Sequence, residues 1–222
     1  MSTSVFYSTS RLHHLYLGQN ELSGSLPSEL SELTMLQELL ASSSQLTGTF
    51  PDLSGCTELQ HIYLAKNKLE GPISESIGNM TSLNRIELSY NSLSSLPSQL
   101  GLLQNAQSID ISHNSLKGAI PSELANMEEL SILLLDNNIL SGAIPSELAL
   151  LENLSVLWLH NNNLTGEMPT EMCNLIETSN RSVHVTVDCL KVVCNCGCDC
   201  EKSTANYQEG NVSAFIAPKN SN

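Results

Sequence analysis

Residues 130–151 read LSILLLDNNILSGAIPSELALL, and this stretch determines how the whole chain is interpreted. Its apolar residues are interrupted by Asn138, Gly142 and Pro145, a spacing that neither a single helix nor a single strand gives. The order L-x-x-L-x-L-x-x-N-x-L recurs before and after it at steps of 23 or 24 residues. Such a period indicates a solenoid, in which each repeat buries its apolar side against the next.

The repeat resembles the leucine-rich repeat, and its S-G-x-I-P-x-x-L half resembles the plant-type subclass. The resemblance implies an α/β solenoid, a right-handed horseshoe with one short parallel strand per repeat. The asparagine of the motif is expected to be structural, satisfying backbone groups at the turn. Seven copies begin at Leu12, Leu36, Leu59, Leu83, Ala106, Leu130 and Leu154.

These boundaries predict the organisation of the chain. We expect an N-terminal stub at 1–11, seven leucine-rich repeats at 12–175, a cysteine-rich C-terminal cap at 176–200 and a disordered tail at 201–222. Within the cap, VHVTV alternates as a last strand would. Related plant-type proteins have a longer N-terminal cap with a cysteine pair, so we expect this N-terminus to be incomplete; the alternative is that a partner covers this end.

Charge and motifs exclude several function classes. The formal net charge is −14 over 222 residues, so nucleic acid and anionic membranes would repel the chain. No apolar run approaches the ~20 residues that span a bilayer, and the first residues lack the apolar core of a signal peptide. No G-x-S-x-G, H-E-x-x-H, G-x-G-x-x-G or G-K-S/T motif occurs. We therefore expect neither catalysis nor a cofactor.

Two residues of each predicted strand alternate with core aliphatics and should face solvent on the concave side. These two columns supply the candidate ligand-binding residues. They are His14, Tyr16, His61, Tyr63, Arg85, Glu87, Asp110, Ile132, Leu134, Val156 and Trp158.

The first four of these residues form a polar, aromatic patch suited to a sugar or peptide, although ordinary surface residues would give the same pattern. Glu87 and Asp110 should lie ~5 Å apart on adjacent strands, a like-charge pair that Arg85 or a basic group of a partner would offset. A catalytic acid and base, as in sugar hydrolases, is disfavoured because an open face does not exclude water.

The remaining candidates are apolar. Ile132, Leu134, Val156 and Trp158 should form an exposed patch, which usually marks an interface, here with a partner or with a second copy in a homodimer. The alternative is that the C-terminal tail, through Phe215 and Ile216, covers them.

The cysteines are concentrated at the C-terminal end. Cys56 replaces a core leucine or methionine and should be a buried thiol. The other six, which we expect to form disulfides that seal the last repeat, are Cys173, Cys189, Cys194, Cys196, Cys198 and Cys200.

Three bonds among these six would require at least one within CNCGCDC, and Gly197 would permit the necessary turn. Closely spaced thiolates that bind Zn²⁺ or Cu(I) are the competing interpretation. The tail also resembles the cysteine-rich ends of leucine-rich-repeat proteins predicted from microalgae.

The sequence leads to a functional prediction. Plant-type members include receptor-like kinase and receptor-like protein ectodomains and inhibitors of polygalacturonases, so the resemblance implies a non-enzymatic module that binds a protein, peptide or glycan. The alternatives are an inhibitor of a secreted hydrolase and a self-associating structural or adhesive wall protein. With the cysteines, five glycosylation sequons favour an extracellular or cell-surface location: Asn79, Asn153, Asn163, Asn180 and Asn211.

Overall fold

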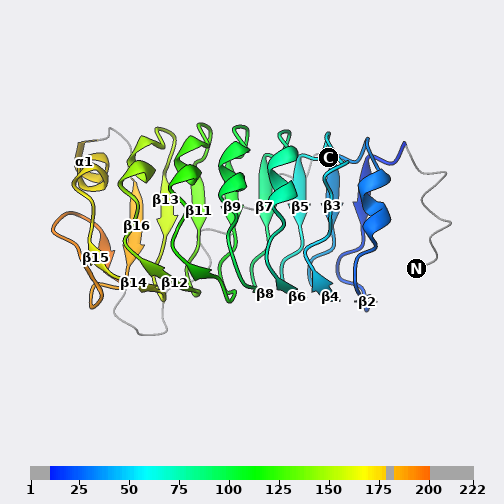
Figure 1. Ribbon diagram of the computed structural model, residues 1–222, viewed down its shortest axis with the longest axis horizontal. Coiled ribbons are helices and arrows are strands. Elements are labelled where there is room, and N and C mark those ends of the chain that lie inside the picture. The colour runs from blue at the N-terminus through cyan, green and yellow to red at the C-terminus, as the bar shows by residue number, and fades with distance from the viewer. Residues whose placement is uncertain (1–10, 179–182, 201–222) are drawn as a thin grey trace.

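The computed structural model describes residues 11–178 and 183–200, which form one elongated stack of repeats (Figure 1). Within these residues a parallel nine-stranded sheet runs along the stack, and neighbouring strands pair in register, for example His14 with Glu38 and Glu38 with His61. The sheet contains β1 (His14–Tyr16), β3 (Glu38–Leu40), β5 (His61–Tyr63), β7 (Arg85–Glu87), β9 (Ser108–Asp110), β11 (Ile132–Leu134), β13 (Val156–Trp158), β16 (His184–Val187) and β18 (Asp199–Cys200).

Short helices cover the side of the stack opposite the sheet (Figure 1). Four of the 3₁₀ helices follow directly after a proline, which lacks an N–H and so leaves no unpaired donor at the helix start. In the third repeat Ser74 replaces this proline, and its side chain accepts a hydrogen bond from the amide of Ser76. The helices are η2 (Ser28–Glu32), η3 (Glu75–Asn79), η4 (Ser98–Leu102), η5 (Ser122–Asn126), η6 (Ser146–Leu150) and α1 (Thr170–Thr178).

A second set of short parallel strands lies along the lower edge in Figure 1. Gly142 ends one of them with φ +86°, which glycine adopts without strain. The fourth repeat lacks this glycine, and the set is divided there into separate ladders. They contain β2 (Ser23–Gly24), β4 (Gln45–Thr49), β6 (Lys68–Gly71) and β8 (Ser92–Leu93), then β10 (Lys117–Gly118), β12 (Ile139–Gly142) and β14 (Asn163–Leu164), and lastly β15 (Gly166–Glu167) with β17 (Val192–Val193).

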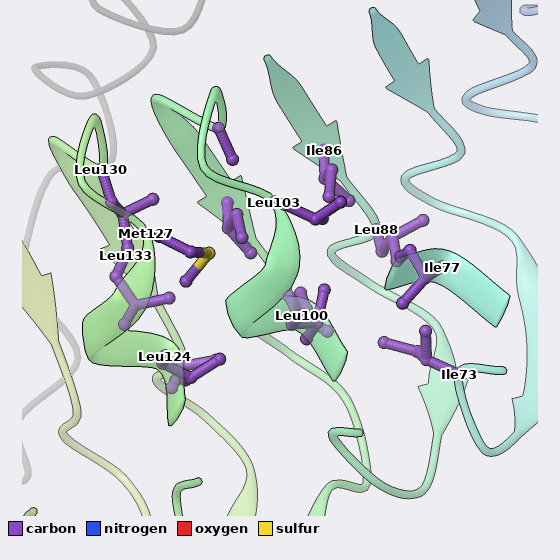
Figure 2. Packing of buried hydrophobic residues seen from close by; sticks show 14 of the residues in the cluster. Ile73, Ile77, Ile86, Leu88, Leu100, Leu103, Leu124, Met127, Leu130 and Leu133 are labelled. Atoms are coloured by element: carbon purple, nitrogen blue, oxygen red, sulfur yellow. The ribbon is translucent and has the colours of Figure 1, made fainter. Parts of the chain in front are cut away.

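The core is a continuous column of aliphatic side chains between the sheet and the helices. Ile86 and Leu133 point inward from strands, and Ile77 and Leu124 point inward from helices, all at most 1% exposed (Figure 2). Cys56 is also fully buried as a free thiol, and its Sγ lies 3.1 Å from the carbonyl oxygen of Leu30. The repeats therefore bury one shared core, as a solenoid must.

The asparagine column forms a ladder that joins successive turns. The side-chain amide of Asn138 donates to the carbonyl of Leu135 in its own repeat and to that of Ile111 in the preceding repeat, and its Oδ1 accepts from the amide of Leu116. The residue before each column position has a left-handed backbone, with φ between 51° and 57°, a strained conformation for a residue other than glycine. The asparagine hydrogen bonds hold the chain in this turn.

The C-terminal end differs from the repeats. The predicted VHVTV strand is present as β16, but the sequence analysis predicted neither the α-helix α1 nor the short strand β18. Asp188 accepts hydrogen bonds from the amides of Asn161 and Asn162, both at 2.9 Å, where the next repeat would otherwise supply carbonyls. The expectations for residues 1–10 and for the tail after 200, including cover by Phe215 and Ile216, lie outside the described residues.

Candidate ligand-binding face

The polar, aromatic patch at the N-terminal end of the concave face is organised by Glu38. Tyr16 donates a short hydrogen bond to Oε2, His14 Nδ1 lies 3.1 Å from the same oxygen, and His61 Nδ1 lies 3.3 Å from Oε1. The Tyr63 ring lies 6.2 Å from that of His61. The structure thus brings His14, Tyr16 and His61 together around a carboxylate that sequence reasoning did not select, and Tyr63 lies beside His61.

Protonation at this patch follows from the same contacts. The hydroxyl of Tyr16, followed by the two imidazoles, lowers the pKa of Glu38, and burial opposes this only in part. The hydrogen bond to the carboxylate raises the pKa of Tyr16. Glu38 therefore stays ionised and fixes the orientation of both histidines. In the sequence, the position of Glu38 in register between His14 and His61 could have identified Glu38 as part of this patch.

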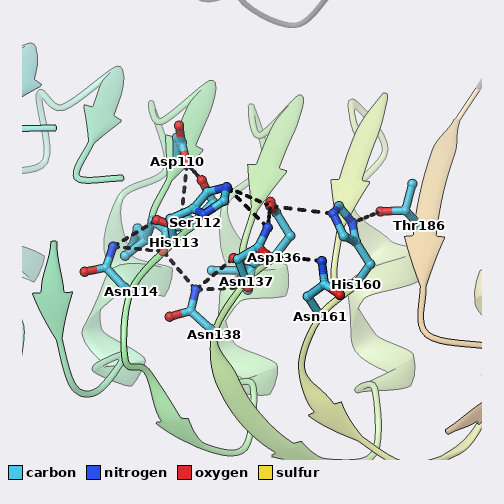
Figure 3. A network of polar contacts seen from close by, with 12 residues as sticks. Asp110, Ser112, His113, Asn114, Asp136, Asn137, Asn138, His160, Asn161 and Thr186 are labelled. Atoms are coloured by element: carbon cyan, nitrogen blue, oxygen red, sulfur yellow. Dashed lines mark hydrogen bonds and ion pairs between the residues drawn. The ribbon is translucent and has the colours of Figure 1, made fainter. Parts of the chain in front are cut away.

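Two carboxylates lie side by side at the centre of the face, where Glu87 pairs in register with Asp110. Asp110 is only 8% exposed, so its predicted exposure to solvent is wrong. Its Oδ1 accepts from the amide and the hydroxyl of Ser112 at 3.0 and 2.6 Å (Figure 3). Side chains one strand away on each side contribute to its burial, because parallel strands lie only ~4.8 Å apart.

Burial disfavours the ionised forms of both central carboxylates. It raises the pKa of Asp110 despite the opposing hydrogen bonds from Ser112. Burial also raises the pKa of Glu87, the charge of Asp110 adds to this, and Arg85 and Lys66 oppose it. Arg85 therefore offsets the like-charge pair only in part. A cationic group brought by a ligand would favour the ionised forms of both carboxylates.

The predicted exposed apolar patch is not present as such. Ile132 and Leu134 are 8% and 3% exposed, and only Val156 and Trp158 are half-buried. Leu134 lies in register between Asp110 and Trp158, and these neighbours contribute to its cover. Of the four residues predicted for this patch, only the two β13 side chains are therefore available to a partner.

A polar network that the sequence analysis missed lies just beyond the strand ends (Figure 3). The Oδ2 atom of Asp136 lies 3.9 Å from Nε2 of His113 and 3.7 Å from Nε2 of His160, and it accepts a 2.7 Å hydrogen bond from Asn137. The other nitrogen of His160 lies 2.7 Å from the hydroxyl of Thr186. His113, Asp136 and His160 follow the strand segments and precede the asparagine column, a position to which the predicted strand alternation assigns no face.

The network continues toward the N-terminus through stacked rings. The rings of Tyr90 and His113 lie 4.1 Å apart at an angle of 9°, and the ammonium of Lys66 lies 5.7 Å from the centre of the Tyr90 ring. Tyr90 is 38% exposed. A polar and aromatic row therefore extends from the third repeat to β16 along one edge of the concave face.

The C-terminal cap contains disulfides. Cys173 of α1 is joined to Cys196, with 5.5 Å between their Cα atoms, and Cys194 is joined to Cys198, with 6.5 Å. The second bond lies within CNCGCDC. Cys189 is disulfide-bonded as well, and the side chain of Cys200 lies outside the described part of the structure.

The sequons lie away from the strand face. Asn79 ends η3, Asn163 lies in β14, and both are exposed, as is Asn153. Asn180 and Asn211 are outside the described residues. Among the described residues, no helix is long and apolar enough to cross a membrane.

The family model of the Leucine Rich Repeat matches residues 11–33, 58–80, 105–127 and 153–175. No curated protein sequence matches the chain significantly.

Solved plant structures match most of the chain. The plant peptide hormone receptor RGFR1 in complex with RGF2 is 33% identical with a TM-score of 0.79, over 87% of this chain and 30% of that one. The ectodomain of the receptor kinase GASSHO1/SCHENGEN3 from Arabidopsis thaliana, in complex with CASPARIAN STRIP INTEGRITY FACTOR 2, is 34% identical with a TM-score of 0.77, over 90% and 25%. The Arabidopsis receptor kinase HAESA, in complex with the peptide hormone IDA and the co-receptor SERK1, is 28% identical with a TM-score of 0.78, over 92% and 37%.

One in-register strand per repeat, the asparagine ladder and the outer helices define a leucine-rich-repeat solenoid with a polar strand face. The chain spans between a quarter and about two fifths of the length of the receptor structures above. With its S-G-x-I-P-x-x-L repeats, the matched repeat segments and these structures, it is similar to the plant-type leucine-rich-repeat proteins.

Proposed function

We propose that this chain is a non-enzymatic recognition module that binds a peptide or protein ligand on its concave strand face, outside the cell. The observation that carries the proposal is the contrast between columns of the sheet. The central residue of each strand is a repeated aliphatic, such as Ile62, Ile86 and Ile109, whereas the residues on either side of it differ from repeat to repeat. A constant scaffold with a varied surface is suited to selective binding.

The dimensions and chemistry of the face are compatible with an extended peptide. The seven strands that the repeats supply, β1 to β13 of the nine-stranded sheet, make a face about 30 Å long at ~4.8 Å per strand, which matches roughly nine residues of extended chain. Along it lie the Glu38 patch, the Glu87 and Asp110 carboxylates, and Trp158. RGFR1 is a peptide hormone receptor, and HAESA is solved with the peptide hormone IDA, which supports a peptide over a glycan for this chain.

The alternatives make different use of the same surface. An inhibitor of a secreted hydrolase would present the concave face to a protein, which the proposal includes as a protein ligand. Self-association through the Trp158 region is less favoured, because Ile132 and Leu134 are buried and leave a smaller apolar area. Catalysis by Glu87 and Asp110 is also disfavoured, since an open strand face does not exclude water from them.

The test is selection from a random peptide display library on the purified chain, followed by binding measurements with the selected peptides. Substituting Tyr63→Ala or Trp158→Ala should weaken binding by about tenfold or more, the cost of losing a central aromatic contact. The exposed Glu123→Ala variant on η5 is the matched control and should bind as the unmodified chain does.

Each variant must also keep the thermal unfolding midpoint of the parent chain. Selected peptides that bind equally well to both concave variants, or that are lost with Glu123→Ala, would show that the strand face is not the ligand site. If Trp158→Ala changes neither peptide binding nor self-association, the β13 region has no role in recognition.

A further inference from the structure

We propose that the C-terminal cap, once its disulfides are reduced, binds one Zn²⁺ ion through Cys194, Cys196 and Cys198, with Cys173 as the fourth ligand. The sulfurs of the first three all lie within 4.8 Å of one another, and those of Cys194 and Cys196 are 4.0 Å apart. In a tetrahedral site with Zn–S bonds of about 2.3 Å, the sulfurs are separated by about 3.8 Å. The sulfurs of Cys194 and Cys196 are therefore already close to the separation that the ion requires. The sulfurs joined in the bonds Cys173–Cys196 and Cys194–Cys198 must move apart once these bonds are reduced.

The backbone of the loop already supports this arrangement. The amide of Cys198 donates to the carbonyl of Cys196 at 2.7 Å, which makes a tight turn around Gly197. The turn keeps the alternating cysteines 194, 196 and 198 in one cluster rather than spread along an extended strand.

Cys173 brings the fourth sulfur from a different element. It lies on α1, and its disulfide to Cys196 places its sulfur next to the cluster. Four thiolates arranged tetrahedrally select Zn²⁺ among the common divalent ions. The four cysteines are partly buried and pack against the hydrophobic core next to Ile176, so water would have limited access to the metal–sulfur bonds.

The disulfide and metal forms exclude each other. A thiol or phosphine reductant must first deliver two electrons to each of the bonds Cys173–Cys196 and Cys194–Cys198, giving four thiols and the oxidised reductant. On binding, the four S–H groups release their protons to the buffer and four Zn–S bonds form. In either form the same sulfurs connect α1 to the terminal loop, so the last repeat would remain covered in a reducing as well as an oxidising environment.

The experiment uses the full chain, reduced with a phosphine under anaerobic conditions and titrated with Zn²⁺ against a chromophoric chelator. We expect one equivalent to bind, and Co²⁺ in its place to give the visible absorption of a tetrahedral thiolate complex. Cys198→Ser and Cys194→Ser should each weaken binding by more than about 100-fold, since changes even to groups that only hydrogen-bond to a metal ligand cost about 10- to 100-fold. Cys56→Ala removes a buried thiol elsewhere and is the matched control.

Several outcomes would overturn the proposal. They are a stoichiometry well below one, unchanged affinity in Cys194→Ser and Cys198→Ser, loss of binding in Cys56→Ala, or equal binding by the oxidised chain. Circular dichroism of each reduced variant separates loss of a ligand from loss of the fold. None of these outcomes bears on the proposed ligand function, because no residue of the concave face takes part.

Discussion

Substitution of Asn138 by alanine tests how far the asparagine ladder stabilises the solenoid. Asn138 is 8% exposed, and its Oδ1 accepts from the amide of Leu116 at 3.0 Å. Alanine removes this acceptor, and Leu116 is fully buried, so water cannot replace it. An unsatisfied buried amide costs about 1–3 kcal/mol.

The substitution affects the carbonyls of Ile111 and Leu135, which accept from Asn138, less than it affects the amide of Leu116. Ile111 O also accepts from Asn114 at 3.2 Å, and Leu135 O also accepts from Asn162 at 3.0 Å, so each keeps a donor after the substitution. Adding a modest cost for these weakened contacts, we expect the free energy of unfolding to fall by about 2–4 kcal/mol.

The assay is urea unfolding followed by circular dichroism, with free energies from linear extrapolation. Asn20→Ala is the matched control, because Asn20 is exposed and, among the described residues, donates only within its own turn, to Leu17 and Gly18. It should cost less than about 1 kcal/mol. The reasoning is refuted if Asn138→Ala costs under about 0.5 kcal/mol, or if Asn20→Ala costs as much as Asn138→Ala.

Three further predictions follow from burial and packing. Burial raises the pKa of Glu87 in the folded chain, so its ionised form destabilises the fold and Glu87→Gln should raise the thermal unfolding midpoint near neutral pH. This gain should vanish as the pH falls toward the ordinary carboxyl pKa of about 4.3. A gain that persists at that pH would contradict the prediction. Burial raises the pKa of Cys56 to about 11, so iodoacetamide should modify this thiol only in denaturant, as mass spectrometry would show. A Cβ on Gly101 would lie 2.1 Å from the carbonyl oxygen of Glu123, so Gly101→Ala should lower the free energy of unfolding in urea by about 1–3 kcal/mol. Gly197→Ala is the control: the atom nearest to its Cβ would be 3.6 Å away, so it should lower this free energy by less than about 0.5 kcal/mol.

The scaffold was predictable from the sequence because each of its features repeats. Leu133 and its counterparts recur with the same period, and so does Asn138, so strand position, core face and turn contacts follow from one repeat. The family model and the plant receptor structures confirm the predicted fold class.

The surface was less predictable because it depends on side chains from different repeats acting together. The role of Glu38 depends on Tyr16 and His61, each one strand away, and the contacts of Asp136 depend on His160. The strand alternation predicts on which face a side chain lies, but it does not predict how far the side chains of neighbouring strands bury it. For that reason Asp110, Ile132 and Leu134 were wrongly predicted to be exposed.

The asparagine ladder has a consequence for how such a chain can change its length. Because Asn91, Asn114 and Asn138 each bond to their own turn and to the preceding one in the same way, deletion of a whole repeat among them would join two turns through contacts that already exist elsewhere. On the concave face, by contrast, different side chains would become neighbours. Loss of the fifth repeat, for example, would place Glu87 beside Leu134 in place of Asp110. Gain or loss of repeats would therefore alter what the protein recognises while leaving its scaffold intact.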